Sequence, residues 1–192
     1  MKSEWYRKGS LFFLVLALII FFYGVFKIMQ KVDKTQLSTK NGIYTSYIST
    51  SQEIKDKAYF LTKACSHTYC KVQEILNFVT NIPYKTETFQ RCTPEKTMAQ
   101  NFGDCDDKSN LLISLLYALE IQAYFVLVPK HIFVIVSLDD IRLSDKKGIW
   151  IEDKAYFILE STAKNSAIGY PLRYNLSQID AIIEPFSNQK IR

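Results

Sequence analysis

The chain has 192 residues, of which 48% are hydrophobic and 22% are charged. This composition predicts a domain with a real apolar core and excludes a disordered chain. The formal net charge at pH 7 is +5, and the lysines are interspersed with acidic residues instead of forming a basic face. Nucleic-acid binding is therefore not expected.

The amino-terminal segment is the strongest compositional feature. The run from Leu11 to Phe26 carries no charge and continues after Lys27 to Met29, which approaches the roughly 20 residues that cross a bilayer. A secretory signal peptide is the alternative, but its apolar region is usually shorter, and no small-residue cleavage site follows here. After a short tail at residues 1–10, the sequence therefore predicts a single-pass transmembrane anchor at residues 11–29.

Positive residues stand on both sides of this run, so they do not decide its orientation. Four cysteines are more typical of an exported domain, where thiols can pair, and we expect the domain to be periplasmic or extracellular. Cys65 and Cys70 are separated by four residues, a span that can bridge a turn, and they form the predicted disulfide. Cys92 could instead pair with either, and Cys105 is expected to stay free.

The organisation after the anchor begins with polar residues 30–50, whose Ser, Thr, Asn and Gly content is typical of a stalk. The domain is then expected at residues 51–192. Apolar residues recur at helical spacing over residues 52–64 and 70–80, which predicts two helices joined by the turn CSHTYC. An irregular loop follows, carrying one short helix with Thr93 as its cap and Pro94 in its first turn.

The next segment, residues 106–121, has a broad apolar face and predicts a buried helix. A second membrane helix over residues 111–128 is the alternative, but Glu120 and Gln122 interrupt it.

Strands follow this helix, because β-branched and aromatic runs bounded by turn residues recur to the end of the chain. We expect strands at residues 123–128 and from His131 onward, two short ones within residues 148–162, and one at residues 181–185. Helices first and antiparallel strands afterwards give the fold class α+β.

Cys105 lies where the buried helix begins, in the stretch NFGDCDDKSN. A helix start offers a partial positive charge and free backbone N–H groups, which favour a thiolate nucleophile, and Gly103 gives the chain freedom to turn sharply into the helix. Neighbouring carboxylates, those of Asp104, Asp106 and Asp107, raise the pKa of a thiol. A positive group is therefore expected nearby, unless Cys105 is a structural thiol.

Two histidines and one glutamate complete the candidate chemistry. His67 lies in the polar interhelical turn and is expected to face solvent. His131 opens a strand and could serve as a base. Glu160 ends an apolar strand, where its carboxylate could hold the other nitrogen of an imidazole. Each residue alone is more often structural, so the hypothesis depends on the set.

These residues stand in a recognisable order. The stretch GDCDDKSNLLISLLYALEIQAYFVLV, then a histidine at the head of the next strand, then a tryptophan and an acidic residue before Ser-Thr, resembles the transglutaminase-like superfamily of papain-fold thiol enzymes. The resemblance covers about residues 52–172. It implies a papain-like core with Cys105 as nucleophile, His131 as general base and Glu160 as orienting acid. The family usually has Asp at the last position, so Glu160 is a departure.

The resemblance also implies a reaction, in which the thiolate attacks an amide carbonyl and a thioester forms that water or an amine resolves. The backbone N–H of Cys105 is one oxyanion donor by position, and Gln100 or Asn101 is a candidate for the second. We expect a membrane-anchored protease, deamidase or acyltransferase that acts on a protein or peptide amide and needs no cofactor or metal. The sequence does not predict its oligomeric state.

Two other functions remain open. One is a catalytically silent, membrane-tethered binding scaffold of the same fold, because a fold does not imply its chemistry. The other is a metal-binding module in which Cys65, His67, Cys70 and Cys92 gather a zinc ion, although their spacing matches no familiar zinc finger.

Overall fold

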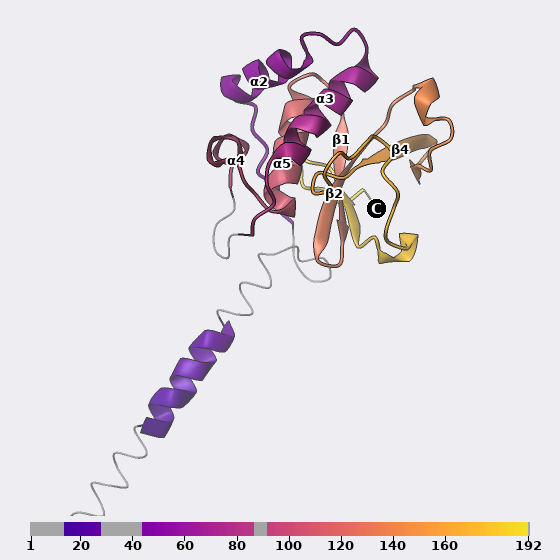
Figure 1. The fold of residues 1–192 in the computed structure, drawn as a ribbon. Helices are drawn as coiled ribbons and strands as arrows, with labels where there is room; N and C mark the ends of the chain where they lie inside the picture. The colour runs from indigo at the N-terminus through magenta and orange to yellow at the C-terminus, as the bar shows by residue number, and fades with distance from the viewer. Residues whose placement is uncertain (1–13, 28–43, 87–91, 192) are drawn as a thin grey trace, which may run out of the picture. The chain divides into compact units, whose positions relative to one another are not determined.

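A computed structural model describes residues 14–27, 44–86 and 92–191 (Figure 1). The chain divides into two units, residues 1–36 and residues 37–192. Within the first unit, residues 14–27 are helical.

The predicted membrane anchor is not supported. Among the residues that the structure describes, no helix has both the length and the apolar character needed to cross a bilayer. The remaining residues of the expected anchor, 11–13 and 28–29, lie outside the described residues. This finding contradicts the prediction of a single-pass membrane protein.

The second unit opens with an irregular segment, residues 44–50, which packs on the domain. The ring of Tyr44 is 4% exposed and belongs to the core, its hydroxyl donates to Asp106, and the backbone N–H of Tyr47 donates to Asn110. Ordered contacts therefore begin before Ser51. The rest of the predicted stalk, residues 30–43, lies outside the described residues.

Two helices follow, as predicted from the apolar spacing. Helix α2 (Gln52–Thr62) is capped by the Ser51 side chain, and α3 (Thr68–Asn81) is capped by His67, whose Nδ1 accepts from the Cys70 N–H at 3.1 Å. The turn between them, residues 63–67, lies two residues earlier than expected, because α2 ends at Thr62 and this cap lets α3 begin at Thr68.

Helix α4 carries the predicted capping residues, and α5 differs from its predicted bounds at both ends. Helix α4 (Pro94–Gln100) has Thr93 as its cap and Pro94 in its first turn, which confirms the prediction. Helix α5 (Cys105–Tyr117) begins one residue before the predicted start and ends four residues before the predicted end. A strand begins at Ala123, so residues 111–128 do not form one membrane helix.

The strands form one antiparallel sheet within the described part of the chain, in the order β3-β4-β2-β1-β5. This confirms the α+β class. The strands are β1 (Ala123–Val128), β2 (His131–Val136), β3 (Ile149–Ile151), β4 (Lys154–Leu159) and β5 (Ala181–Ile183).

The register of the strands brings His131 and Glu160 together. Val128 pairs with His131 across a two-residue turn, and Val134 pairs with Leu159. Because β2 and β4 are antiparallel, the residue after Leu159 lies toward the start of β2. Glu160 is therefore carried toward His131.

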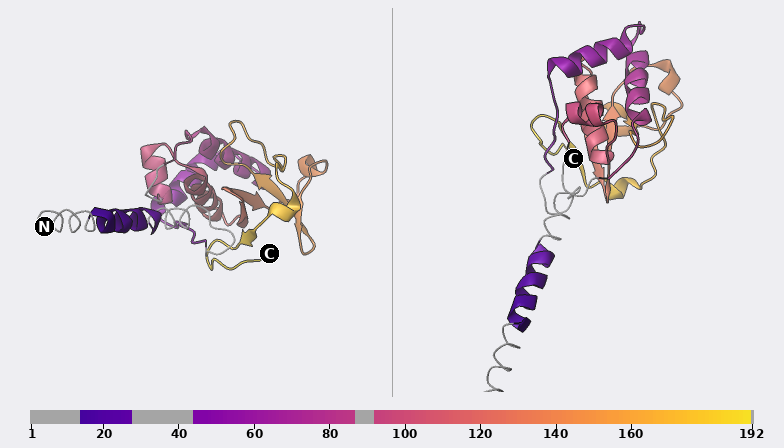
Figure 2. Two further views of the ribbon diagram at one scale, coloured as in Figure 1. Left: turned by 90° about the horizontal axis from the view of Figure 1, so that it is seen from below. Right: turned by 60° about the vertical axis from the view of Figure 1, so that its left-hand side comes forward.

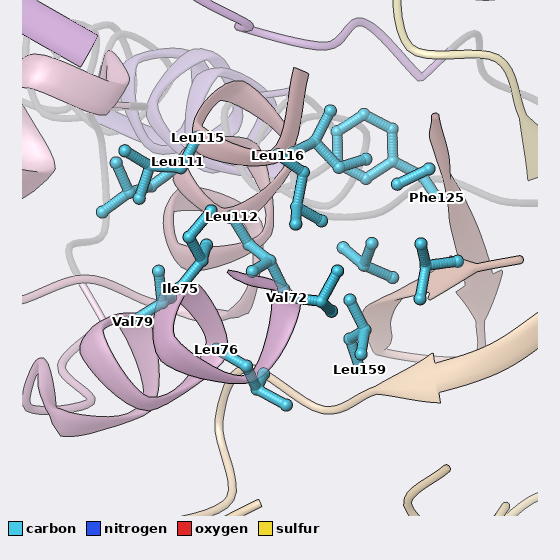
Figure 3. Packing of buried hydrophobic residues seen from close by; sticks show 14 of the residues in the cluster. Val72, Ile75, Leu76, Val79, Leu111, Leu112, Leu115, Leu116, Phe125 and Leu159 are labelled. Atoms are coloured by element: carbon cyan, nitrogen blue, oxygen red, sulfur yellow. The ribbon is translucent and has the colours of Figure 1, made fainter. Parts of the chain in front are cut away.

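The core lies between the helices and one face of the sheet. Helix α5 contacts α3 as well as strands β1 and β2, and Figure 2 shows the helices grouped on one side of the strands. Leucine, isoleucine and valine side chains fill this core, and their burial supplies the main stabilising free energy of the domain. Figure 3 shows part of this packing, with Val72, Ile75, Leu76, Val79, Leu111, Leu112, Leu115, Leu116, Phe125 and Leu159.

A second buried cluster lies on the other face of the sheet. It includes Tyr124, Phe133, Tyr156 and Ile158, and the later segment of the chain that contains Tyr170, Leu172 and Tyr174 packs against it. Both faces of the central strands are thus covered, which explains why β1 is buried along its whole length and reads as a continuous apolar run.

Candidate active site

Cys105 is the first residue of α5, held there by a capping box. The Asp104 carboxylate accepts the backbone N–H groups of Asp106 at 2.9 Å and Asp107 at 3.1 Å, and the Asp107 carboxylate accepts the Asp104 N–H in return. These bonds satisfy helix-start donors that would otherwise lack partners. They fix a cysteine that is only 7% exposed at the positive end of the helix.

Gly103 is required by space at this helix start. A Cβ atom there would lie 2.9 Å from the Asp107 Cβ and 3.1 Å from the Thr97 Cγ2. Its φ is not in the left-handed region, so the expected reason, freedom to turn sharply, is replaced by close approach of α4 and α5. The backbone of Gly103 also pairs with residues 83–85 after α3, with its N–H donating to Pro83 at 3.2 Å and its carbonyl accepting from Lys85 at 3.1 Å.

His131 and Glu160 form the polar pair at the sheet end. His131 Nε2 lies 2.8 Å from Glu160 Oε2, and the other carboxylate oxygen accepts the backbone N–H of Thr162 at 3.0 Å and its hydroxyl at 2.6 Å. Burial alone would raise the pKa of Glu160, but the bonds from His131 and Thr162 outweigh it and hold this pKa below its ordinary value. Glu160 is therefore an ionised acceptor that fixes the imidazole, and its longer side chain still reaches the ring.

Cys105 contacts the start of β2 through a backbone group. The backbone N–H groups of Ile132, the residue after His131, and of Asp106 act on its sulfur and lower the thiol pKa. The structure thus places Cys105 beside the strand that carries His131.

The surroundings of Cys105 favour the protonated thiol over the thiolate. Burial, and then the carboxylates of Asp104 and Asp106, raise the pKa of Cys105 to about 12, against the opposing effect of the two backbone N–H groups. Asp104 and Asp106 thus raise the thiol pKa, as predicted. Asp107 is not among the groups that raise it; its carboxylate accepts the Cys92 N–H at 2.9 Å and the Asp104 N–H of the helix cap. A base is needed before this sulfur can attack.

Two tyrosines near the thiol were not identified from the sequence. The pKa of Tyr84 is raised by burial and then by Cys105 and Asp104. The pKa of Tyr174 is raised by burial and then by Glu160 and Cys105. Both hydroxyl groups therefore lie within electrostatic range of Cys105. Tyr84 carried a local signal, since it ends the stretch NIPY before the cysteine, whereas Tyr174 carried none.

Lys108 is the other residue that the sequence did not reveal. Its side chain is 1% exposed, and its ammonium donates to the Ile82 carbonyl at the end of α3 at 2.7 Å. Burial lowers the pKa of Lys108 to about 8, although the nearby Glu160 charge opposes this. Its spacing from Leu111, Leu112 and Leu115 on the apolar face of α5 was the available signal.

Gln100 and Asn101, the two candidates for the second oxyanion donor, lie at the end of α4. The Gln100 amide donates to the Phe102 carbonyl at 2.9 Å and to the Cys92 sulfur at 3.4 Å. Asn101 is the exposed C-cap of α4 in the left-handed conformation, with φ of 54°. Neither makes a hydrogen bond to Cys105 among the described residues.

The cysteines separate into two kinds. Cys65 and Cys70 form a disulfide with their Cα atoms 5.5 Å apart, and Cys92 and Cys105 are buried thiols. The disulfide leaves Cys65 and Cys70 no thiolate for the zinc site considered above. Within residues 14–27, 44–86 and 92–191, no group of three or more His, Cys, Asp or Glu side chains is arranged to hold a metal ion.

Comparison with known families addresses the fold and the site together. Residues 55–136 match the Transglutaminase-like superfamily. The match runs from α2 to the end of β2 and includes Cys105 and His131, but it stops before Glu160. It supports the superfamily resemblance for this part of the chain.

Solved structures give more distant likenesses. A protein from Cytophaga hutchinsonii, named a "Putative Cysteine Protease", is 19% identical with a TM-score of 0.47 over 62% of this chain and 40% of its own. A "putative protease" from Parabacteroides distasonis is 15% identical with a TM-score of 0.40 over 73% of this chain and 30% of its own. This chain thus spans less than half the length of either. No curated protein matches it.

Proposed function

We propose that this protein is a thiol enzyme of transglutaminase-like type that attacks amide bonds with Cys105, His131 and Glu160. The observation that carries the proposal is the 2.8 Å bond between His131 and an ionised Glu160, at the strand start that contacts Cys105. The family match over the cysteine and histidine supports the same class of enzyme.

In the proposed mechanism, His131 is the general base. Ionised Glu160 accepts at Nε2, so the neutral ring carries its proton there and Nδ1 is left to receive the thiol proton. As Cys105 sulfur attacks the amide carbonyl carbon, its proton passes to Nδ1. The imidazolium, stabilised by Glu160, then protonates the leaving amine and the thioester remains. Water or a second amine resolves it.

The oxyanion of the tetrahedral intermediate needs preorganised donors. In the described part of the chain, the Cys105 backbone N–H has no hydrogen-bond acceptor, and it is the proposed first donor. The hydroxyl groups of Tyr84 and Tyr174, both within electrostatic range of Cys105, join Gln100 and Asn101 as candidates for the second.

The test is incubation of the full chain with peptide amides and a labelled primary amine, followed by mass spectrometry. Cleavage, deamidation or amine incorporation is expected for the wild type and absent for Cys105→Ala. His131→Ala is expected to lower the rate at least about a hundredfold. Product formation by Cys105→Ala would exclude the proposed nucleophile.

One observation favours a silent binding scaffold of the same fold, namely the Cys105 pKa of about 12, which is also expected of an inert buried thiol. The two functions differ in acylation. If the protein is a thiol enzyme, p-nitrophenyl acetate is expected to acetylate Cys105 in the wild type and much more slowly in His131→Ala. If it is a scaffold, Cys105 is expected to stay unmodified in both the wild type and His131→Ala.

A further inference from the structure

A cavity of about 340 Å³ lies beside the His131–Glu160 pair, and both side chains line it. This volume falls within the range of small-ligand pockets. Tyr174 also lines the cavity, and its ring stacks on the His131 ring with centroids 6.2 Å apart and 21° between the planes. A group bound in this cavity therefore lies next to the imidazole.

The charges around this cavity favour an anion. Lys130 and Arg173 supply two cations. The acid among the lining residues is Glu160, and both of its carboxylate oxygens are already bonded to His131 or Thr162. An incoming carboxylate would meet two positive side chains and no unengaged negative one.

Local structure holds the Arg173 side chain in place and fixes the backbone of Lys130. Arg173 donates to the Tyr170 hydroxyl, and its guanidinium lies over the Tyr170 ring, 5.2 Å from the centroid. Lys130 sits in the two-residue turn between β1 and β2, with a left-handed φ of 62°. An anchored cation such as Arg173 loses less side-chain entropy when it binds an anion than a free surface side chain does.

The proposed reaction decides which part of a substrate would occupy the cavity beside His131. In the proposed function, the imidazole of His131 gives a proton to the leaving amine, so the amine component must lie against that ring. The incoming amine of a transfer reaction approaches along the same path in reverse. The cavity that the ring lines is therefore on the amine side of the scissile bond.

We propose that this cavity is a subsite for a carboxylate carried by the amine component of the substrate, whether leaving group or acyl acceptor. The inference rests on the proposed function and specifies its substrate class. In transfer, the amine nitrogen attacks the thioester carbonyl carbon, and the C–N bond forms as the C–S bond breaks. The amine proton passes through His131 to the departing Cys105 sulfur, so the enzyme returns to its starting state.

The test uses an acyl donor that needs no specificity on the acyl side. Cys105 is acetylated with p-nitrophenyl acetate, and acetyl transfer to three acceptors is measured: Gly-Glu amide, Gly-Gln with a free carboxyl terminus, and Gly-Gln amide. The first carries a side-chain carboxylate, the second a terminal one and the third none. We expect transfer to at least one carboxylate acceptor to exceed transfer to Gly-Gln amide about five- to tenfold.

Charge-neutralising variants assign the effect to the cavity. Lys130→Gln and Arg173→Gln are each expected to reduce this preference, and the double variant to bring it near one. Lys164→Gln is the matched control, because Lys164 is exposed and does not line the cavity, and it is expected to keep the preference. Equal transfer to all three acceptors by the wild type, or a preference that survives in the double variant, would overturn the subsite.

A binding measurement separates failure of the subsite from failure of the proposed function. Absence of Cys105 acetylation rejects the thiol enzyme and leaves the subsite to be decided by NMR titration of Cys105→Ala with Gly-Glu amide and Gly-Gln amide. Shifts at Lys130, Arg173 and Tyr174 with the acidic dipeptide alone support the subsite. Equal responses to both dipeptides reject it.

Discussion

At the scale of single residues, the protonation of Cys105 decides how the site can work. The sequence suggested that a helix start and a histidine would hold a thiolate. The structure adds burial to the expected effect of the Asp104 and Asp106 carboxylates, and together they raise the pKa of Cys105 to about 12. Attack at neutral pH therefore requires transfer of the thiol proton during the reaction, and a preformed thiolate is not expected.

This leads to a prediction for iodoacetamide. In a Cys92→Ala background, alkylation of Cys105 is expected to rise about tenfold per pH unit between pH 7 and 9, because only the small thiolate fraction reacts. The rate is measured by mass spectrometry without reductant, so that Cys65 and Cys70 stay paired. A plateau below pH 8 would show a preformed thiolate and contradict the general-base mechanism.

Glu160 gives a second residue-scale prediction. Glu160→Gln can still bond to His131 but cannot stabilise its positive charge, so turnover is expected to fall about a hundredfold to ten-thousandfold, by analogy with other triads. Alkylation of Cys105 at pH 9 is expected to change much less, since it needs no imidazolium. Both rates are measured on the same preparation, and equal losses in the two would indicate a structural fault instead.

The usual family residue supplies the matched control. Glu160→Asp keeps the charge but shortens the side chain, whose Oε2 now lies 2.8 Å from His131 Nε2. The turnover of this variant is therefore expected to lie between those of the wild type and Glu160→Gln. Turnover of Glu160→Asp below that of Glu160→Gln would mean that reach matters more than charge.

At the scale of elements, the start of α5 combines capping and electrostatics in Asp104. Its carboxylate caps the helix and also raises the pKa of Cys105. These effects can be separated, because Asn caps a helix nearly as well as Asp without the charge.

Asp104→Asn is therefore expected to lower the Cys105 pKa while it leaves the free energy of unfolding almost unchanged. Asp104→Ala is expected to lower the same pKa and also to cost about 1 kcal/mol of stability through the lost cap. Urea denaturation and the pH dependence of alkylation measure the two quantities. If Asp104→Asn alkylates no faster than wild type at pH 8, the carboxylate does not act on the thiol as inferred.

Most elements were predictable from local sequence. Period-3.6 spacing predicted α2, α3 and α5, the Thr93-Pro94 pair predicted α4, and β-branched runs predicted the strands. The errors occur at ends, where capping decides: His67 starts α3 earlier than its apolar residues suggest. The predicted membrane anchor was a different kind of error. It depended on an uncharged run, which is a compositional signal, and no helix among the described residues is long and apolar enough to support it.

At the scale of the whole molecule, Lys108 connects layers that are distant in sequence. It lies on α5, donates to the carbonyl of Ile82, the C-cap residue of α3, and is within electrostatic range of Glu160 after β4. Its pKa, lowered to about 8 by burial, makes the free energy of unfolding depend on pH. Between pH 8 and the unfolded pKa of about 10.4, the unfolded chain keeps a proton that the folded chain has released, so the Lys108 contribution to stability rises with pH.

The corresponding measurement compares Cys105→Ala with Cys105→Ala/Lys108→Met, so that the thiol does not titrate. The stability difference between them is expected to shift by about 2 kcal/mol in favour of the lysine form from pH 7.5 to 10. Replacing the exposed Lys164 with Met in the same background is expected to give no such trend. A difference that is constant with pH would contradict a lowered Lys108 pKa.

The sequence by itself determined the α+β order of elements and the candidates Cys105, His131 and Glu160, because helix and strand periodicity and the start of a helix are local properties. Only the tertiary structure decided which side chains meet. The antiparallel register of β2 and β4 brings Glu160 to His131, α3 buries Lys108, and the segment 170–174 supplies Tyr174 and Arg173 beside the imidazole. Burial and long-range contact arise from packing between segments far apart in the chain, which no local pattern encodes.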